Sequence, residues 1–109
     1  MLIKFDKIKE VSIHGLNGGD GSVSAKMFID QNGKILISRL PSGASIGIHR
    51  HETNSEINYV LSGNGKSICD GQEEKLTAGS CEYCPKGSSH SIINDGNEDL
   101  FLFTVVSEK

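Results

Sequence analysis

The sequence has no tryptophan, only two prolines and only three cysteines. Cys69, Cys81 and Cys84 are an odd number, too few for the disulfide framework that staples many small secreted domains. The Cys81-x-x-Cys84 spacing also occurs in redox and zinc sites, where such pairs usually belong to a larger pattern. Because this pair is isolated and lies in a strand-like stretch, a structural role for both thiols is favoured.

Long apolar runs and strong charge are also lacking. The longest apolar run, residues 100–106, is interrupted by Thr104, whereas a helix that crosses a bilayer needs about 20 apolar residues. Eleven basic residues against 14 acidic ones give a net charge of −3. The one basic cluster, residues 4–9, contains Asp6 and offers no stripe that matches a phosphate backbone. We therefore expect neither a membrane nor a nucleic acid as partner.

The first residues, MLIKFDKIKE, carry charges where a secretory signal peptide has its apolar region. This arrangement predicts a cytoplasmic location.

Glycine is abundant, at 13 of 109 residues, and no helical hydrophobic period persists. Short runs rich in Ile, Val, Leu, Phe and Thr alternate instead with turn residues, which is typical of an all-β sandwich or barrel. The length predicts one domain, residues 1–109. The last expected strand is apolar on both alternations, so we expect burial on both of its faces. Strands are expected at residues 2–5, 10–14, 23–29, 34–40, 44–51, 56–62, 65–70, 72–76, 80–84, 89–94 and 99–106.

Two dipeptides, Asn32-Gly33 and Asp70-Gly71, predict tight hairpins of type I′, in which both central residues need positive φ. The glycine-rich residues 17–21 could be taken for a phosphate-binding loop. No Lys-Ser/Thr pair and no helix follow them, so a plain loop is the favoured interpretation.

Four potential metal ligands lie in two segments framed by glycine. On a strand, His49 and His51 share one face, about 6–7 Å apart along the chain. Glu56 begins the next strand after a polar turn, and His90 opens a later strand. Three neutral imidazoles and one carboxylate suit Fe²⁺, Mn²⁺, Ni²⁺, Co²⁺ or Zn²⁺, and the sequence does not distinguish among these ions. Four ligands on an ion that prefers six leave two positions open for a small molecule.

These two segments resemble the two motifs of the cupin superfamily. The first motif, G-x5-H-x-H-x3–4-E-x6-G, fits residues 43–63 at both glycines, both histidines and the glutamate. The second, G-x5-P-x-G-x2-H-x3-N, fits residues 79–94 at Gly79, Pro85, Gly87, His90 and Asn94. Every fixed position of both motifs is present.

The resemblance implies a double-stranded β-helix, a jelly-roll barrel with one divalent transition metal per chain in its mouth. It implies His49, His51, Glu56 and His90 as the ligands. Small cupins resemble one another in forming dimers, often with N-terminal strands packed across the interface. Residues 1–14 alternate apolar and charged side chains, so we expect a homodimer.

Three further residues are weaker candidates for catalysis or substrate contact. Asn58 stands where cupins often have Tyr, and period-2 alternation turns it inward with Glu56, either to support that ligand or to touch substrate. Arg39 could bind a substrate carboxylate or be solvated. Tyr83 could donate a proton near the mouth or pack at the rim.

Two functions remain open because the cupin fold hosts many reactions. One is metal-centred catalysis of the isomerase, lyase or dioxygenase type on a small oxygen-rich metabolite, an organic acid or a sugar derivative. The alternative is a non-catalytic, metal-dependent module that binds or senses such a molecule. Proton-transfer chemistry needs a positioned acid or base. From the sequence, none can be placed inside the barrel besides the ligands.

Overall fold

The computed structural model describes residues 1–108 and is built almost entirely from strands. Two short 3₁₀ turns, Phe5–Lys7 and Leu16–Gly18, are the helical segments in this part of the chain, and neither could cross a bilayer. The strands are β1 Val11–His14, β2 Ser22–Asp30, β3 Gly33–Leu40, β4 Ser45–Arg50, β5 Ser55–Ser62, β6 Asn64–Cys69, β7 Gln72–Thr77, β8 Cys81–Cys84, β9 Ser89–Ile93 and β10 Leu100–Ser107.

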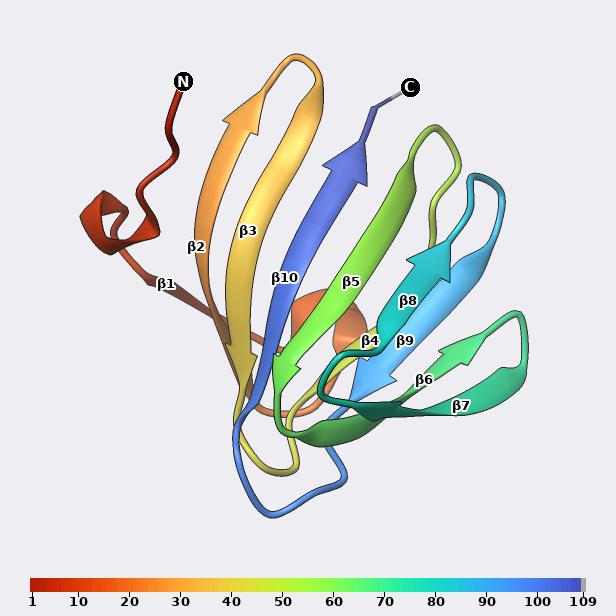
Figure 1. Cartoon of the computed structure of the whole chain (residues 1–109). Coiled ribbons are helices and arrows are strands. Elements are labelled where there is room, and N and C mark those ends of the chain that lie inside the picture. The colour runs from red at the N-terminus through yellow and green to blue at the C-terminus, as the bar shows by residue number, and fades with distance from the viewer. Residues whose placement is uncertain (109) are drawn as a thin grey trace.

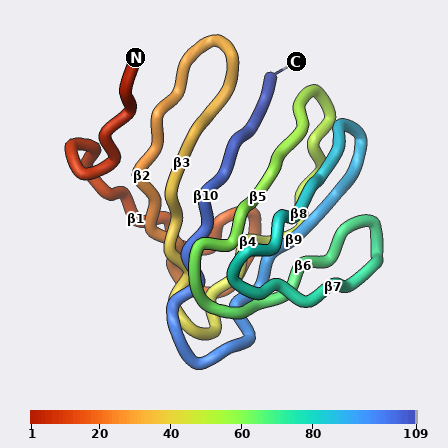
Figure 2. The backbone as a smooth tube through the Cα atoms, in the orientation of Figure 1, coloured from red at the N-terminus to blue at the C-terminus, as the bar shows by residue number. Residues whose placement is uncertain are grey.

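The strands form two antiparallel sheets that face each other (Figure 1). One sheet has six strands in the order β1-β2-β3-β10-β5-β8, and the other has four in the order β4-β9-β6-β7. The chain crosses from one sheet to the other several times, so the backbone wraps into a jelly roll that is open at one end (Figure 2). The predicted all-β jelly-roll barrel is confirmed.

Ten of the expected strands are present with ends shifted by a residue or two, but the strand expected at residues 2–5 is wrong. This segment leads into the 3₁₀ turn, and β1 begins only at Val11 and pairs with β2. The Phe5 ring instead packs edge-on against Phe103 of β10, with ring centroids 6.4 Å apart. A side-chain contact therefore takes the place of strand pairing.

The two predicted hairpins differ in outcome. Asp70 and Gly71 have φ values of 49° and 82° and join Cys69 to Gln72, as a type I′ turn requires. The turn expected at Asn32-Gly33 lies one residue earlier, because Asp30 already pairs with Gly33. The Asp30 carboxylate accepts a hydrogen bond from the backbone N–H of Asn32 at 2.8 Å and stabilises this alternative turn.

The hydrophobic core fills the closed end of the barrel, where β3, β5 and β9 end and β10 begins. It consists of Val23, Leu40, Ala44, Val60, Leu76, Ile92, Leu100 and Leu102. The expected burial of β10 on both faces is wrong for the single chain: alternate residues are buried, whereas Phe101, Phe103 and Val105 on the outer face are only half-buried. Apolar packing therefore closes one end and leaves the other to polar side chains.

The loop at residues 17–21 forms part of the wall around the open end. Gly19 and Gly47 lie so close that a Cβ on Gly47 would stand 2.1 Å from the carbonyl oxygen of Asn17. Ser45 strengthens the contact, because its hydroxyl accepts the backbone N–H of Asp20 at 2.9 Å. The plain-loop interpretation fits, since the loop packs on β4 and places Asn17 at the cavity.

Candidate metal centre

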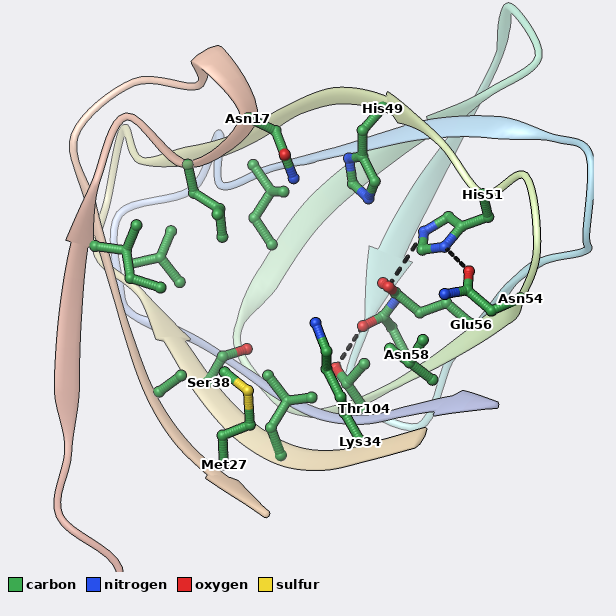
Figure 3. Close-up of a pocket in the computed structure, with 17 residues that line it drawn as sticks. Asn17, Met27, Lys34, Ser38, His49, His51, Asn54, Glu56, Asn58 and Thr104 are labelled. Atoms are coloured by element: carbon green, nitrogen blue, oxygen red, sulfur yellow. Dashed lines mark hydrogen bonds and ion pairs between the residues drawn. The ribbon is translucent and has the colours of Figure 1, made fainter. Parts of the chain in front are cut away.

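Four side chains meet at the open end of the barrel: His49 on β4, His51 just after it, Glu56 at the start of β5 and His90 at the start of β9. One ligand atom from each lies within 4.8 Å of all the others. Figure 3 shows His49, His51 and Glu56 pointing into the same cavity. The fold therefore brings together the four residues that the sequence predicts as ligands.

A β-bulge in β4 aims His49 inward. Ile46 pairs with Ile92 and His49 pairs with His90, so three steps on β4 oppose two steps on β9. In a regular strand, residues three apart face opposite sides, whereas here both Ile46 and His49 line the cavity. Gly47 lies in the irregular stretch, so the same glycine serves the bulge and the close approach of the loop.

All three imidazoles are oriented by a hydrogen bond through Nδ1. His49 Nδ1 donates to the carbonyl oxygen of Gly47 at 2.8 Å, and His51 Nδ1 donates to Asn54 Oδ1 at 2.6 Å. His90 Nδ1 donates to the Glu82 carboxylate at 2.7 Å. Because each Nδ1 faces an acceptor, each neutral ring carries its proton there and keeps the Nε2 lone pair for an ion.

The spacing of these atoms suits one divalent ion. His51 Nε2 and His90 Nε2 lie 3.0 Å apart, and the Glu56 carboxylate oxygens lie 3.3 Å and 3.4 Å from them. Two ligands about 2.1 Å from one ion at a right angle are about 3.0 Å apart. When both Nε2 atoms are acceptors, no hydrogen lies between them and the short distance is not a hydrogen bond. A cation bound by both nitrogen atoms would make this distance favourable. The cluster could therefore hold a metal ion.

Glu82 is the residue of this site that sequence reasoning missed. Its side chain is 5% exposed, and its two oxygens accept hydrogen bonds from His90 Nδ1 and, at 2.9 Å, from Asn58 Nδ2. Glu82 and Cys84 share the inner face of β8, in register with Asn58 and Glu56, and this pairing between distant strands leaves no signal in the sequence. The barrel interior thus contains a second carboxylate besides that of Glu56.

Asn58 holds the carboxylate of Glu56 in place. It is 1% exposed, donates to Glu56 Oε2 at 2.7 Å and to Glu82, and accepts the hydroxyl of Thr104. Both amide hydrogens are therefore used inside the protein. Of the two roles left open by the sequence, the structure favours support of the carboxylate over contact with substrate.

The structure places the other two candidates outside the cavity. Tyr83 is 59% exposed and pairs with Ile57 on the outer face of the six-stranded sheet. Arg39 lies 3.7 Å from both Glu10 and Asp99, which makes it part of a partly exposed ion-pair cluster. Neither side chain reaches the four candidate metal ligands.

Burial and charge act in opposite directions on two of the imidazoles. Burial lowers the pKa of His49, and the hydrogen bond to Gly47 only partly offsets this. Burial also acts to lower the pKa of His90, but Glu82, through its hydrogen bond and charge, and Glu56 outweigh it and raise that pKa above its usual value. The second proton of the His90 ring, on Nε2, is held below this raised pKa and lost as the pH rises through it. Because a bound ion would have to displace that proton, metal affinity would fall as the pH falls.

The Cys81-x-x-Cys84 pair does not present two thiolates to one ion. Cys81 is exposed and Cys84 is fully buried, on opposite faces of β8. Burial, together with the nearby Cys69 and Glu82, raises the pKa of Cys84 to about 12, and its thiol lies 3.6 Å from the carbonyl of Ser88. At neutral pH this side chain is a thiol packed in the barrel wall.

The cavity in front of the cluster has a volume of about 360 Å³. Its wall next to the histidines is polar, whereas the remainder is largely apolar, with Leu16, Val23, Met27, Leu36 and Ile46 among its residues. Lys34 and Asn17 also line it, and Figure 3 shows both pointing toward the central space. A small molecule that enters can meet the metal ligands, an apolar wall and one ammonium group.

Comparisons with known proteins agree with the fold and the motif. A family model described as a cupin domain matches residues 36–106. The oxalate-binding protein of Thermotoga maritima is 34% identical over 112 residues, covering 97% of this chain and 93% of that protein. A crystal structure of a predicted oxalate decarboxylase from Thermotoga maritima has a TM-score of 0.94 and 30% identity, covering 100% of both chains. The cupin domain of Schizosaccharomyces pombe Cnp3 is similar in fold alone: its TM-score is 0.79 and its identity 13%, over 97% of this chain and 72% of that one.

The Glu82→Gln variant tests the hydrogen bond that orients His90. The amide keeps the shape of the carboxylate but removes its charge, so we expect metal affinity to fall by roughly 10–100-fold. Competition with a chelator of known affinity measures the change. Glu74→Gln, on the exposed strand β7, is the matched control and should leave affinity unchanged. Equal affinities for the Glu82 variant and the wild type would contradict the assigned role.

Proposed function

The chain belongs to the cupin family, and on that basis we propose that it binds small chelating carboxylates of the oxalate class at a divalent metal in the barrel mouth. The observation that carries the proposal is the convergence of three Nε2 atoms and one carboxylate at the wall of a cavity of about 360 Å³. Four protein ligands leave two positions of a six-coordinate ion to the ligand.

The bound ion would supply the positive charge and the two open positions that a pair of carboxylate oxygens can occupy. The protein holds the surrounding groups in place. Asn58 and Glu82 fix the ligands Glu56 and His90, and Asn54 fixes His51 while donating to Glu108 at 2.9 Å. This rigidity reduces the ordering that binding would otherwise require.

Two observations support an acid as the ligand. The relative from Thermotoga maritima is named for oxalate binding and is similar over nearly the whole chain. Lys34 lines the same cavity as His49 and His51, whereas the carboxylates of Glu56 and Glu82 are engaged with the histidines. An anionic chelator suits both the ion and the ammonium group.

Metal-centred catalysis by an isomerase, lyase or dioxygenase mechanism stays a prediction, as does the identity of the ion. The other titratable side chains among the described residues that line the cavity are the candidate ligands His49, His51 and Glu56, which a bound ion would occupy. Lys34 is then the one left free to transfer a proton. Binding without turnover therefore needs fewer assumptions, and we favour it. The three free cysteines support a reducing location such as the cytoplasm.

We further propose a homodimer formed through the outer face of the six-stranded sheet. Tyr59 and Leu61 of β5 are 42% and 46% exposed, beside Tyr83 and the half-buried Phe101 and Phe103. Contiguous apolar patches of this kind mark interaction surfaces. A second copy of the chain would bring an equally apolar, self-complementary face, and small cupins resemble one another in forming dimers.

Oxalate should raise the melting temperature of the metal-loaded protein and leave that of the metal-free protein unchanged. A ligand at 100 times its Kd that binds only one folded state adds about 2.7 kcal/mol, which a melting curve detects. Glu56→Gln weakens the ligand set and should abolish the shift. Acetate, which offers a single carboxylate, is the matched control and should stabilise much less. Identical shifts with and without metal would refute the proposed docking point.

A charge in the centre of the outer apolar face should separate the dimer. The Tyr59→Glu variant is expected to show a mass near 11.7 kDa by light scattering, and the wild type about twice that value. Ile29→Glu, at an exposed position near the tip of the β2–β3 hairpin, is the control and should remain dimeric. A wild-type mass near 11.7 kDa at micromolar concentration would exclude this assembly.

A further inference from the structure

Lys34 lies in the same cross-strand row as the ligand Glu56. It pairs with Val106 of β10, and Val106 pairs in turn with Glu56 of β5. Neighbouring strands are about 4.8 Å apart, so the Lys34 backbone lies about 10 Å from that of Glu56 on the same inner face. A lysine side chain covers much of this distance, and Figure 3 shows that of Lys34 directed into the cavity.

The ammonium group of Lys34 has no carboxylate partner within 4.0 Å among residues 1–108. Glu108, two residues beyond Val106, accepts a hydrogen bond from Asn54 instead. Lys34 is an exposed residue at the mouth, so its ammonium is hydrated and available to an entering molecule. It is the one basic side chain, apart from the histidines, among the described residues that line the cavity.

The charges around the metal site require such a group when the ligand carries more than one negative charge. The carboxylates of Glu56 and Glu82, which both contact His90, would together balance the charge of a divalent ion bound there. A chelating dianion would then add negative charge to a partly desolvated cavity, which is unfavourable without a compensating cation. Lys34 supplies that cation at the far side of the cavity from the histidines.

The cavity shared by Lys34 and the candidate ligands, about 360 Å³ in volume, is larger than oxalate needs. Val106 lies between Lys34 and Glu56 in the cross-strand row, and Leu36 and Met27 line the cavity one row deeper. A short aliphatic segment can pack there, whereas polar atoms would lose hydrogen bonds with water. The wall therefore separates two anion-binding positions by an apolar spacer.

Resting on the proposed function, we propose that the preferred ligand is a chelating acid with a second anionic group on a short aliphatic arm, and that Lys34 binds this second group. The 2-oxo or 2-hydroxy acid end meets the metal, the methylene groups contact Val106 and Leu36, and the distal carboxylate meets the Lys34 ammonium. Lys34 is then the residue that determines specificity between acids with charged and uncharged tails.

Calorimetric titration of the metal-loaded protein with two probes of equal size tests this assignment. 2-Oxoglutarate carries a distal carboxylate, and 5-methyl-2-oxohexanoate replaces it with an uncharged branched group of the same number of heavy atoms. We expect 2-oxoglutarate to bind the wild type about tenfold or more tightly, and this preference to weaken as salt is added. Lys34→Met should remove the preference by weakening only 2-oxoglutarate, and Lys34→Arg should largely keep it.

Lys26→Met is the matched control, because Lys26 alternates with Met27 and lies on the outer face of the same sheet. It should leave both affinities unchanged. Loss of both probes to the same extent in Lys34→Met, or no loss of either, would overturn the role of Lys34. Oxalate titrated in parallel separates the two proposals. If oxalate binds only with metal but Lys34→Met does not change the ratio between the probes, the specificity assignment fails alone. If oxalate does not bind either, the proposed function fails with it.

Discussion

The site depends on one repeated interaction: each histidine donates its Nδ1 proton to an acceptor fixed by the fold. The acceptors are the carbonyl of Gly47, the amide of Asn54 and the carboxylate of Glu82. This arrangement settles the tautomer and the rotation of all three rings and directs three Nε2 lone pairs to one place. Without these partners the rings could rotate away, and the short distance between His51 Nε2 and His90 Nε2 would not persist.

The barrel architecture lets the protein bury these polar groups without losing the stability of the fold. The apolar core closes the end at Leu40, Leu100 and Leu102, so the polar cluster at the open end is not required for folding the sheets together. Buried carboxylates and amides are costly unless they are hydrogen-bonded. Glu82 and Asn58 meet this condition through each other, through His90 and through Thr104. The network is thus both the support of the ligands and the reason that their burial is tolerated.

Much of the fold and the metal cluster could be predicted because the signals are local. Alternation and turn residues located the strands from β1 to β10, and the spacing of His49, His51, Glu56 and His90 placed four ligands on strand ends. The strand expected at residues 2–5 was wrong because, among residues 1–108, no strand pairs with this segment, which leads into a 3₁₀ turn instead. The position of the turn near Asn32 depends on which residue of β2 pairs with Gly33. Asp30 does so, and its carboxylate stabilises the resulting turn by accepting the backbone N–H of Asn32.

Glu82 and Lys34 could not be found from the sequence because their roles depend on register between strands far apart in the chain. Glu82 matters because β8 places it opposite Asn58, and Lys34 matters because β10 connects its row to that of Glu56. Neither pairing has a local signature. The structure thus shows a buried carboxylate beside His90 and an exposed ammonium across the cavity, neither of which the sequence could place.

The most direct test of the metal centre is elemental analysis of protein purified without chelator. The convergence of His49, His51, Glu56 and His90 predicts close to one divalent transition metal ion per chain in the wild type. The His49→Ala, His51→Ala double variant should lose nearly all of it while it keeps the far-ultraviolet circular dichroism of a β protein, because the core lies at the other end of the barrel. Full metal occupancy in the folded double variant would show that the ion is held elsewhere and would contradict the account.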